Sequence, residues 1–334
     1  MTDPVLAVSL GDPAGIGPEL IAEAWFRRAK ERLPAFFVCG GAGVLAAAAD
    51  RRGIAVPIIR ISNACEAASA CLDGLPVIGA HDGRYQPGAP DQDGARLAVV
   101  SLTAAMQVAL QGEAWGLVTG PVAKAALAAV GFTYPGQTEF VANACGVAAS
   151  DAVMMLAGPS LRTVPLTVHI ALAEVPARLT VELIVRRCTI VAEALHRDFG
   201  ITAPRLAVCG LNPHAGEQGR IGREEIEVIA PAIARLRAAG IDASGPHPAD
   251  SLFTPRQRAT YDVAIAMYHD QALVPLKALD FDLGVNVTLG LPVVRTSPDH
   301  GTAFAIAGTG QASAEATIAA IRLAGEIAHR RAAA

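Results

Sequence analysis

Short apolar runs rich in β-branched residues alternate along the whole chain with longer Ala- and Leu-rich stretches, and this alternation strongly constrains the fold. Apolar runs that end in Gly or polar residues are typical of buried strands, and the longer stretches are typical of helices. The predicted strands are 5–10, 35–39, 115–119, 152–157, 163–168, 205–209 and 262–267. The predicted helices are 18–31, 92–111, 179–198, 222–239 and 312–331. This order indicates parallel strands joined by crossover helices, and therefore a doubly wound α/β fold.

The composition is that of a globular protein. The chain has 334 residues, 52% hydrophobic and 17% charged, which is enough for one large or two medium α/β domains with true cores. A formal net charge of -4 with scattered Lys and Arg residues argues against nucleic acid as a partner. No uninterrupted apolar segment of about 18 residues is present, so we expect no membrane span. The N-terminus has no basic region ahead of a long apolar run, so we expect a cytoplasmic protein.

Six cysteines are dispersed along the chain and show no Cys-x-x-Cys spacing. Most of them lie in apolar strand or helix contexts, where a free thiol behaves as a small hydrophobic side chain. They are Cys39, Cys65, Cys71, Cys145, Cys188 and Cys209. We expect them to be reduced and structural.

Three histidines follow predicted strands at the points where those strands end. His169 follows 163–168, His214 follows 205–209 and His269 follows 262–267. In α/β folds, sites gather at the carboxyl ends of strands, and three imidazoles with one open position form a typical divalent-metal site, most naturally for zinc. The alternative is that each histidine is only hydrogen-bonded within its own loop, and the spacing leaves both readings open.

Two glycine-rich turns follow predicted strands. "GDPAGIGPE" at 11–19 places Pro18 and Glu19 where a helix begins, so it is either a plain helix start or a site for a phosphate group. "GAGVLA" at 41–46 fits the G-x-G-x-x-A form of the dinucleotide fingerprint, but the following run, "VPIIRIS", ends in Ser62 instead of an acidic residue. A tight turn without a cofactor is the simpler interpretation of this second motif.

A polar set punctuates the apolar passage "YHDQALVPLKALDFDLGVNVTLGLPVVRTSPDHGTA". Lys277, Asn286 and Arg295 are plausible ligands for a phosphate or carboxylate, because a buried cation needs an anionic partner. Internal ion pairs would also explain the two cations. The acidic candidates for such pairs are Asp270, Asp280 and Asp299.

These motifs together resemble the 4-hydroxythreonine-4-phosphate dehydrogenases of the bacterial vitamin B6 pathway. The resemblance covers essentially the whole chain, through "GDPAGIGPE", "TGPVAK", "GQTEF", "GLNPHAGE", "MYHDQ" and "GVNVTLGLPVVRTSPDHGTA". It implies two α/β domains of the isocitrate and isopropylmalate dehydrogenase type with a cleft between them. It also implies a homodimer that completes each active site at its interface. We expect a first domain of residues 1–128 plus 308–334, and a second domain of residues 129–307 that carries the metal ligands and dimer contacts.

The resemblance also implies the roles of particular residues. The metal ligands would be the three strand-end histidines, His169, His214 and His269, one of them contributed across the dimer interface. Lys277 and Asp250 are assigned as catalytic residues. The substrate-binding residues would be Gln137, Thr138, Lys277, Asn286 and Arg295.

The implied reaction is NAD-dependent, or NADP-dependent, oxidation of 4-phosphooxy-L-threonine at C3. Decarboxylation then gives 3-amino-2-oxopropyl phosphate in pyridoxal phosphate biosynthesis. A divalent metal (zinc, magnesium or cobalt) would lower the pKa of the reacting hydroxyl and act as an electron sink when CO2 leaves. The alternatives are a related dehydrogenase of another phosphorylated hydroxy acid or of a cis-dihydrodiol carboxylate, a zinc hydrolase, and a non-catalytic sugar-phosphate binder.

The sequence departs from the family pattern at two positions. Gln137, in "GQTEF", stands where the family usually has histidine, and an amide cannot become a cation or take a proton near neutral pH. Arg220 also replaces a usual histidine, and we expect it to point to solvent. We expect Gln137 to be a tolerated hydrogen-bonding replacement whose amide reaches an anionic oxygen of the substrate.

Overall fold

The computed structural model describes residues 5–333, which divide into two compact units. Unit 1 contains the residues up to Ala149 together with Leu291–Ala333, and unit 2 contains Ser150–Gly290. The domains expected from the sequence are discontinuous in the same way, but they assign 129–149 and 291–307 to the second domain. Those domain boundaries remain a prediction.

Unit 1 is built on parallel strands. Within the described residues their spatial order is β3-β4-β2-β1-β5-β12. The strands are β1 (Val5–Ser9), β2 (Ala35–Cys39), β3 (Ile58–Ile61), β4 (Leu75–Ile78), β5 (Gly116–Thr119) and β12 (Val294–Pro298). The chain leaves β1 toward β2 on one side and later returns to β5 on the other side. The ends of β1 and β5 therefore form a topological switch point, where α/β proteins commonly bind ligands.

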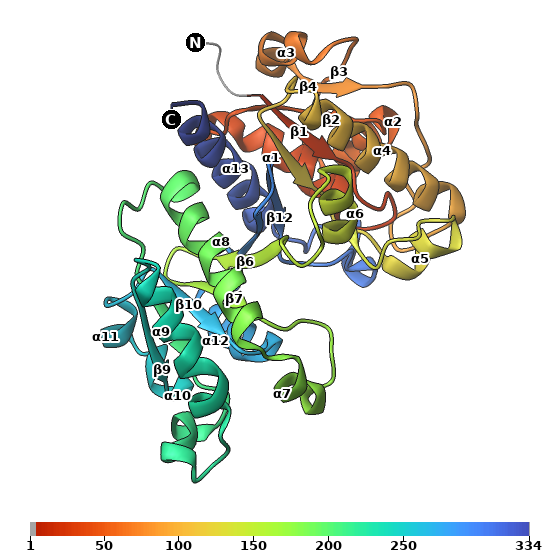
Figure 1. The fold of residues 1–334 in the computed structure, drawn as a ribbon. Coiled ribbons are helices and arrows are strands. Elements are labelled where there is room, and N and C mark those ends of the chain that lie inside the picture. Colours follow the sequence, from red (N-terminus) through yellow and green to blue (C-terminus); the bar gives the residue numbers. More distant parts are fainter. Residues whose placement is uncertain (1–4, 334) are drawn as a thin grey trace. The chain divides into compact units, whose positions relative to one another are not determined.

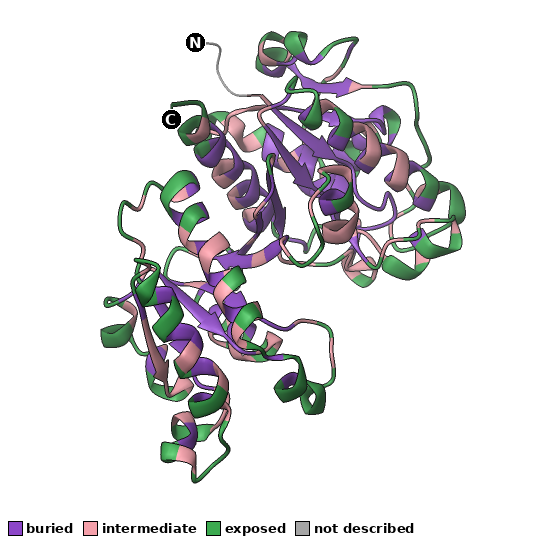
Figure 2. Ribbon diagram, in the orientation of Figure 1, coloured by how far each residue is buried: buried purple, intermediate pink, exposed green. Residues whose placement is uncertain are grey.

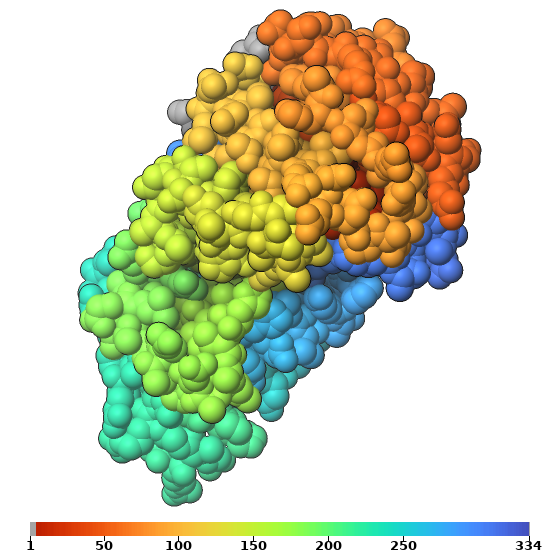
Figure 3. Space-filling model, turned by 90° about the vertical axis from the view of Figure 1, so that its right-hand side faces the viewer, coloured from red at the N-terminus to blue at the C-terminus, as the bar shows by residue number. Residues whose placement is uncertain are grey.

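The helices of unit 1 cover its sheet on both faces (Figure 1). They are α1 (Gly17–Glu31), α2 (Ala42–Arg52), α3 (Ala67–Asp73), α4 (Gln92–Leu110), α5 (Lys124–Ala129), α6 (Gln137–Ala144) and α13 (Glu315–Ala333), with 3-10 turns at Ala64–Glu66 and Phe304–Ile306. Helix α13 packs on β12, β5 and β1, and α4 packs on β1, β2 and β5. Figure 2 shows the strands buried beneath helices whose outer faces are exposed, and little of the red N-terminal segment is visible on the face drawn in Figure 3.

Unit 2 has a mixed sheet with the strand order β11-β6-β7-β10-β8-β9. Its strands are β6 (Val153–Ala157), β7 (Arg162–Pro165), β8 (Leu206–Cys209), β9 (Ala243–His247), β10 (Val263–Ala266) and β11 (Val285–Leu289). Its helices are α7 (Val175–Arg178), α8 (Val181–Phe199), α9 (Ala230–Ala238), α10 (Ala249–Leu252), α11 (Pro255–Arg258) and α12 (His269–Asp280), with short 3-10 or π turns at Leu172–Glu174, Pro213–Gly219 and Glu225–Ile229. Its core includes Leu156, Cys209, Tyr261, Leu273 and Leu276.

The α/β class is confirmed, and all seven predicted strands are present with small differences at their ends. The expectation of uniformly parallel strands is wrong at β6, which runs antiparallel to both β7 and β11. The reason is local: only residues 158–161 join β6 to β7, and so short a connection makes a hairpin and not a crossover. The predicted helix 222–239 begins with the π turn and continues as α9.

Two expectations about the chain's environment can be compared with the structure. Among residues 5–333, no helix combines the length and the apolar character that a membrane span requires.

All six cysteines are free thiols, and four of them (Cys39, Cys71, Cys188 and Cys209) are buried. The four buried thiols agree with the expectation of reduced, structural cysteines, whereas Cys65 is exposed.

Candidate active site

The loops after β1, β5 and β12 meet at one edge of unit 1. The Asp12 amide donates a hydrogen bond to Pro121 O at 2.9 Å, and the Ile16 amide donates to Thr302 O at 3.0 Å. Gly11 has a φ of +75°, and a Cβ there would lie 2.6 Å from Pro121 O, so only glycine permits this close approach. We call the side chains at this edge, those of Asp12, Thr119, Gln137 and Arg295, the unit 1 cluster.

Arg295 is the buried cation of this cluster. It lies on β12, is only 4% exposed, and donates from Nη2 to Thr119 Oγ1 at 2.8 Å. Burial lowers the pKa of Arg295 to about 10, and the nearby carboxylate of Glu139 opposes that shift. The guanidinium is therefore still charged at neutral pH and can attract an anion.

Two of the three aspartates considered as ion-pair partners of Lys277 and Arg295 have other partners in the structure. Asp280 accepts a hydrogen bond from the Ser160 amide at 2.9 Å, and Asp270 Oδ1 lies 2.7 Å from His269 Nδ1. Both carboxylates thus have local partners within unit 2.

Gln137 and Thr138 begin helix α6. Gln137 Nε2 donates to Gly120 O, at the end of β5, at 3.0 Å. Gln137 Oε1 is buried, and no donor within residues 5–333 reaches it. Near this helix start, a Cβ on Gly136 would lie 3.0 Å from Glu139 Oε2 and 3.8 Å from Lys124 Nζ. The amide is thus held at one end and has an unused acceptor at the other.

Two of the three strand-end histidines lie together in unit 2. β7 and β10 are neighbouring parallel strands, and the ring centroids of His169 and His269 are 5.9 Å apart. They line a cavity of about 310 Å³, which we call the histidine cavity. Its other lining residues are Thr167, Val168, Ile170, Leu172, Val175, Tyr268 and Asp270. His169 has a φ of 54°, a conformation that non-glycine residues adopt rarely and often at functional sites.

His214 is exposed and does not line this cavity. It lies in the turn after β8, where His214, Ala215, Gly216, Glu217 and Gln218 all have positive φ angles. Across residues 5–333, no three His, Cys, Asp or Glu side chains are grouped so that they could hold a metal ion. The three-histidine ligand set therefore stays a prediction.

The other residues assigned from the sequence also lie in unit 2. Lys277 is in the last turn of α12, and Asn286 is on β11 with its Oδ1 atom buried and unpaired among the described residues. Asp250 is exposed on α10 and does not line the histidine cavity. Arg220, at the end of the Pro213–Gly219 turn, is exposed, which agrees with its expected orientation toward solvent.

The two glycine-rich turns prove to be helix starts. Glu19 of α1 is buried, and its carboxylate accepts from the Gly308 amide at 3.1 Å and pairs with Arg52 at 3.2 Å. At α2, the carboxylate of Asp82 accepts from the Gly43 amide at 2.7 Å and the Val44 amide at 3.4 Å. A carboxylate thus fills the position that a cofactor phosphate would take, which favours the simple turn at 41–46.

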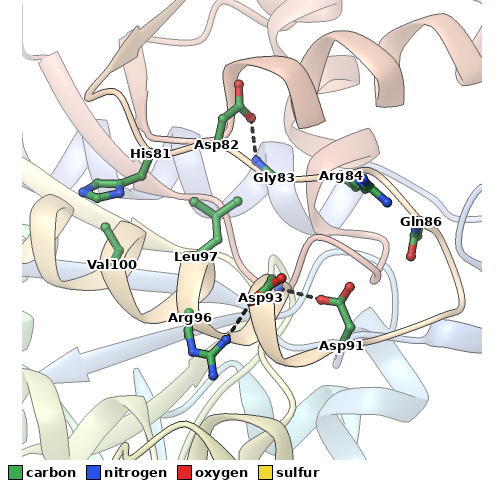
Figure 4. A pocket seen from close by; sticks show the side chains of 11 residues that line it. His81, Asp82, Gly83, Arg84, Gln86, Asp91, Asp93, Arg96, Leu97 and Val100 are labelled. Atoms are coloured by element: carbon green, nitrogen blue, oxygen red, sulfur yellow. Dashed lines mark hydrogen bonds and ion pairs between the residues drawn. The ribbon is translucent and has the colours of Figure 1, made fainter.

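Asp82 also lines a polar hollow of about 600 Å³ between the 81–91 loop and α4 (Figure 4). In the view of Figure 4, Leu97 and Arg96 project from α4, and Arg84 and Gln86 lie on the loop. The Asp91 side chain accepts from the Gly94 amide at 2.7 Å and so caps α4. Two of the three aspartates that line the hollow, Asp82 and Asp91, therefore accept hydrogen bonds from amides at helix starts.

Sequence reasoning missed the polar groups of the unit 1 cluster that come from its loops. Asp12 is 2% exposed and its Oδ2 atom has no partner among the described residues. Burial raises the pKa of Asp12, a hydrogen bond from the Ala14 amide opposes the shift, and Asp91 adds to it. The available signal was its place directly after a strand, in the "GDPAGIG" turn.

The fold and these clusters define an α/β protein that holds a buried cation and polar amides at its strand ends, with paired histidines in a second unit. This is the arrangement of an enzyme for small anionic molecules. The family described as pyridoxal phosphate biosynthetic protein PdxA matches residues 32–324. The chain belongs to this family.

Curated relatives and solved structures agree with this assignment. The chain is 63% identical over 327 residues to a 4-hydroxythreonine-4-phosphate dehydrogenase of Erythrobacter litoralis, covering 98% of this chain and 97% of that protein. It is 53% identical over 327 residues to the protein of that name from Zymomonas mobilis, covering 98% and 96%.

Among solved structures, the 4-hydroxythreonine-4-phosphate dehydrogenase of Klebsiella pneumoniae superimposes with a TM-score of 0.85 at 37% identity, covering 98% of this chain and 100% of that chain. A terephthalate 1,2-cis-dihydrodiol dehydrogenase of Burkholderia xenovorans gives a TM-score of 0.65 at 30% identity, covering 97% and 98%. Both the TM-score and the sequence identity are thus higher for the 4-hydroxythreonine-4-phosphate dehydrogenase than for the dihydrodiol dehydrogenase.

Proposed function

We propose that this chain is a 4-hydroxythreonine-4-phosphate dehydrogenase. It oxidises 4-phosphooxy-L-threonine at C3 with NAD or NADP, and decarboxylation gives 3-amino-2-oxopropyl phosphate in pyridoxal phosphate biosynthesis. The observation that carries the proposal is the 63% identity to a relative of that name along 98% of this chain. The buried guanidinium of Arg295 supports it, because the substrate carries a phosphate and a carboxylate.

The histidine cavity fits a divalent metal. Imidazole nitrogens are preferred ligands of zinc and cobalt, and the pair on β7 and β10 offers two of them. The hydrogen bond between His269 Nδ1 and Asp270 at 2.7 Å fixes the ring and leaves Nε2 for an ion. We infer that His214 supplies the third ligand from the partner chain of a homodimer, since it is absent from the histidine cavity of its own chain.

A nicotinamide would supply the hydride acceptor, and a divalent ion held by His169 and His269 would supply positive charge near the reacting hydroxyl and carboxylate. We assign Gln137, Thr138, Lys277, Asn286 and Arg295 to substrate binding. Arg295 and Lys277 neutralise the anionic groups and orient the substrate for reaction. Lys277 and Asp250 are the candidates for proton transfer.

A second candidate is oxidation of a cis-dihydrodiol carboxylate. The observation that favours it is the similarity to the terephthalate dihydrodiol dehydrogenase, at 30% identity over 97% of this chain. Such a substrate keeps the carboxylate and the hydroxyl but has no phosphate, so the same cationic residues would have one anionic group fewer to bind.

One assay separates the two candidates. The purified chain is depleted of metal with a chelator and supplied with NAD or NADP and either 4-phosphooxy-L-threonine or the terephthalate cis-dihydrodiol. Zinc, magnesium or cobalt is then added back to each mixture. We expect NADH or NADPH to form from the phosphorylated substrate only when metal is restored. Turnover of the dihydrodiol alone would establish the second candidate instead.

A further inference from the structure

The turn that carries His214 has a left-handed backbone. The five residues 214–218 have φ angles from 42° to 76°. Only Gly216 among them is a glycine, and the other four are His214, Ala215, Glu217 and Gln218. Side chains disfavour this conformation, so non-glycine residues adopt it singly and not in runs. It persists only where the surrounding structure holds it. Contacts from outside the turn must therefore fix its shape.

The carboxylate of Glu225 makes such contacts. Glu225 begins the π turn Glu225–Ile229 and is 4% exposed. Its Oε1 atom accepts a hydrogen bond from the backbone amide of Asn212 at 2.7 Å, and its Oε2 atom accepts from Asn212 Nδ2 at 3.0 Å. A buried carboxylate is stable only when its oxygens have such partners. Asn212 directly precedes the turn Pro213–Gly219, so the residue from which the turn starts is held at two atoms.

The middle of the turn also packs on this carboxylate. Gly216 is buried, and a Cβ at that position would lie 2.5 Å from Glu225 Oε2. A Cβ on Gly210 would lie 3.2 Å from Glu225 Oε1. The two glycines thus allow the backbone to approach the carboxylate before the turn and within it.

The start of this segment is fixed independently of Glu225. The Gly210 amide donates to His247 O at 2.8 Å, at the end of β9. Gly210 O accepts from Gln271 Nε2 at 2.9 Å, and Gln271 Oε1 accepts from the Met267 amide at 2.6 Å. The end of β8 is therefore tied to its neighbours β9 and β10. What remains to be determined is the path of the turn beyond it, and Glu225 contacts that path.

We propose that Glu225 is a positioning residue, which holds the left-handed turn so that His214 is presented to a metal ion. This inference rests on the proposed function, in which His214 is a metal ligand. Glu225 acts through the backbone at Asn212 and Gly216 and is not itself a ligand. His214 is exposed, so the backbone of the turn determines where its ring lies. Residues that orient metal ligands strengthen metal binding without contacting the ion.

A purely structural role for Glu225 makes a different prediction. An acidic residue in the first turn of a helix stabilises that helix through the charge of the helix end. If this were all that Glu225 does, its loss would lower the stability of the chain without any effect that depends on His214. Metal affinity measured with and without His214 therefore separates the two roles.

The test measures Co2+ binding to the metal-free full-length chain by visible absorption. Glu225→Gln keeps the size of the side chain but replaces one acceptor oxygen by an NH2 group, which cannot accept from Asn212 Nδ2. We expect the affinity for Co2+ to fall by about 10- to 100-fold, as for other residues that orient metal ligands. Glu227→Gln is the matched control, because Glu227 lies in the same π turn but is exposed and pairs with Arg223. Its affinity for Co2+ should equal that of the wild type.

A double-mutant cycle with His214→Ala shows whether Glu225 acts through His214. In the His214→Ala background, Glu225→Gln should change the affinity for Co2+ by less than about twofold, because the ligand that it positions is already absent. An equal loss in both backgrounds would overturn the positioning role. Unchanged affinity in Glu225→Gln alone would overturn it as well.

Gly216→Ala tests the same contact from the turn. It leaves Glu225 intact but places a methyl group 2.5 Å from Oε2, at a φ of +76°. Its affinity for Co2+ should also fall about tenfold or more, and it replaces Glu225→Gln in the cycle if that variant does not fold.

Failure of the positioning role is distinct from failure of the proposed function. A wild type that binds no Co2+ would refute the metal site and this inference together. A His214-dependent loss of Co2+ affinity, in a wild type that forms no NADH from 4-phosphooxy-L-threonine, would refute the proposed substrate and uphold the role of Glu225.

Discussion

At the scale of single residues, Arg295 is a buried cation whose guanidinium is suited to binding an anion. Its guanidinium is almost fully buried, and it donates a hydrogen bond to the neutral hydroxyl of Thr119. Keeping a charge out of water is unfavourable unless another group compensates for it. The carboxylate of Glu139 supplies part of that compensation, and a bound phosphate or carboxylate would supply more.

Replacement of Arg295 by Ala should lower kcat/KM for the phosphorylated substrate by about 30- to 700-fold, which corresponds to about 2–4 kcal/mol for a charge-assisted contact. Burial lowers the pKa of Arg295 to about 10, so the wild type should also lose substrate affinity as the pH rises through about 10 and the guanidinium loses its proton. Steady-state kinetics from pH 7 to 10.5 measure both effects. Arg256→Ala, on the exposed surface of α11, is the matched control. Unchanged kinetics in the Arg295 variant would exclude it from the site.

At the scale of secondary-structure elements, the start of α2 depends on a side chain distant in the sequence. Asp82 lies 39 positions beyond Gly43, and its carboxylate satisfies amide groups in the first turn of α2. Helix starts leave several amides without partners within the helix and favour negative charge. The 81–91 loop therefore does for α2 what an N-cap residue does locally for other helices.

Asp82→Ala should lower the free energy of unfolding by about 1 kcal/mol, within the 0.5–2 kcal/mol typical of lost caps. Asp82→Asn keeps an acceptor oxygen and should recover most of the difference. Urea denaturation of the three proteins, followed by circular dichroism, measures it. Equal stability of the Ala variant and the wild type would show that water replaces the carboxylate without loss.

At the scale of the whole molecule, we propose that a second chain completes the metal site. His169 and His269 come together within one chain, whereas His214 does not line their cavity. In a symmetric dimer with shared sites, each chain would contribute its histidine pair to one site and His214 to the other. Two differently damaged chains could then form one intact site between them.

His214→Ala and His169→Ala should each be inactive alone, yet regain activity when unfolded and refolded together. Half of the dimers in an equal mixture contain both chains, and one of their two sites is intact, so about a quarter of wild-type activity is expected. His196→Ala, on α8, should remain fully active and serves as the control. Recovery that stays at background in the mixture would show that the sites are not shared.

The sequence by itself determined the elements and the family. Strand periodicity predicted seven strands, because burial between helix layers selects apolar β-branched runs, and the motifs identified a dehydrogenase family that the full-length matches confirm. Only the tertiary structure decided which groups meet. The predicted strands did not include the short strands β3, β4, β9, β11 and β12. Periodicity contains no information about which groups pair, so the antiparallel direction of β6 and the cap that Asp82 gives α2 were not foreseen either. The same holds at Gln137, because its amide donates to Gly120 O, a backbone atom that only the folded chain brings within 3.0 Å.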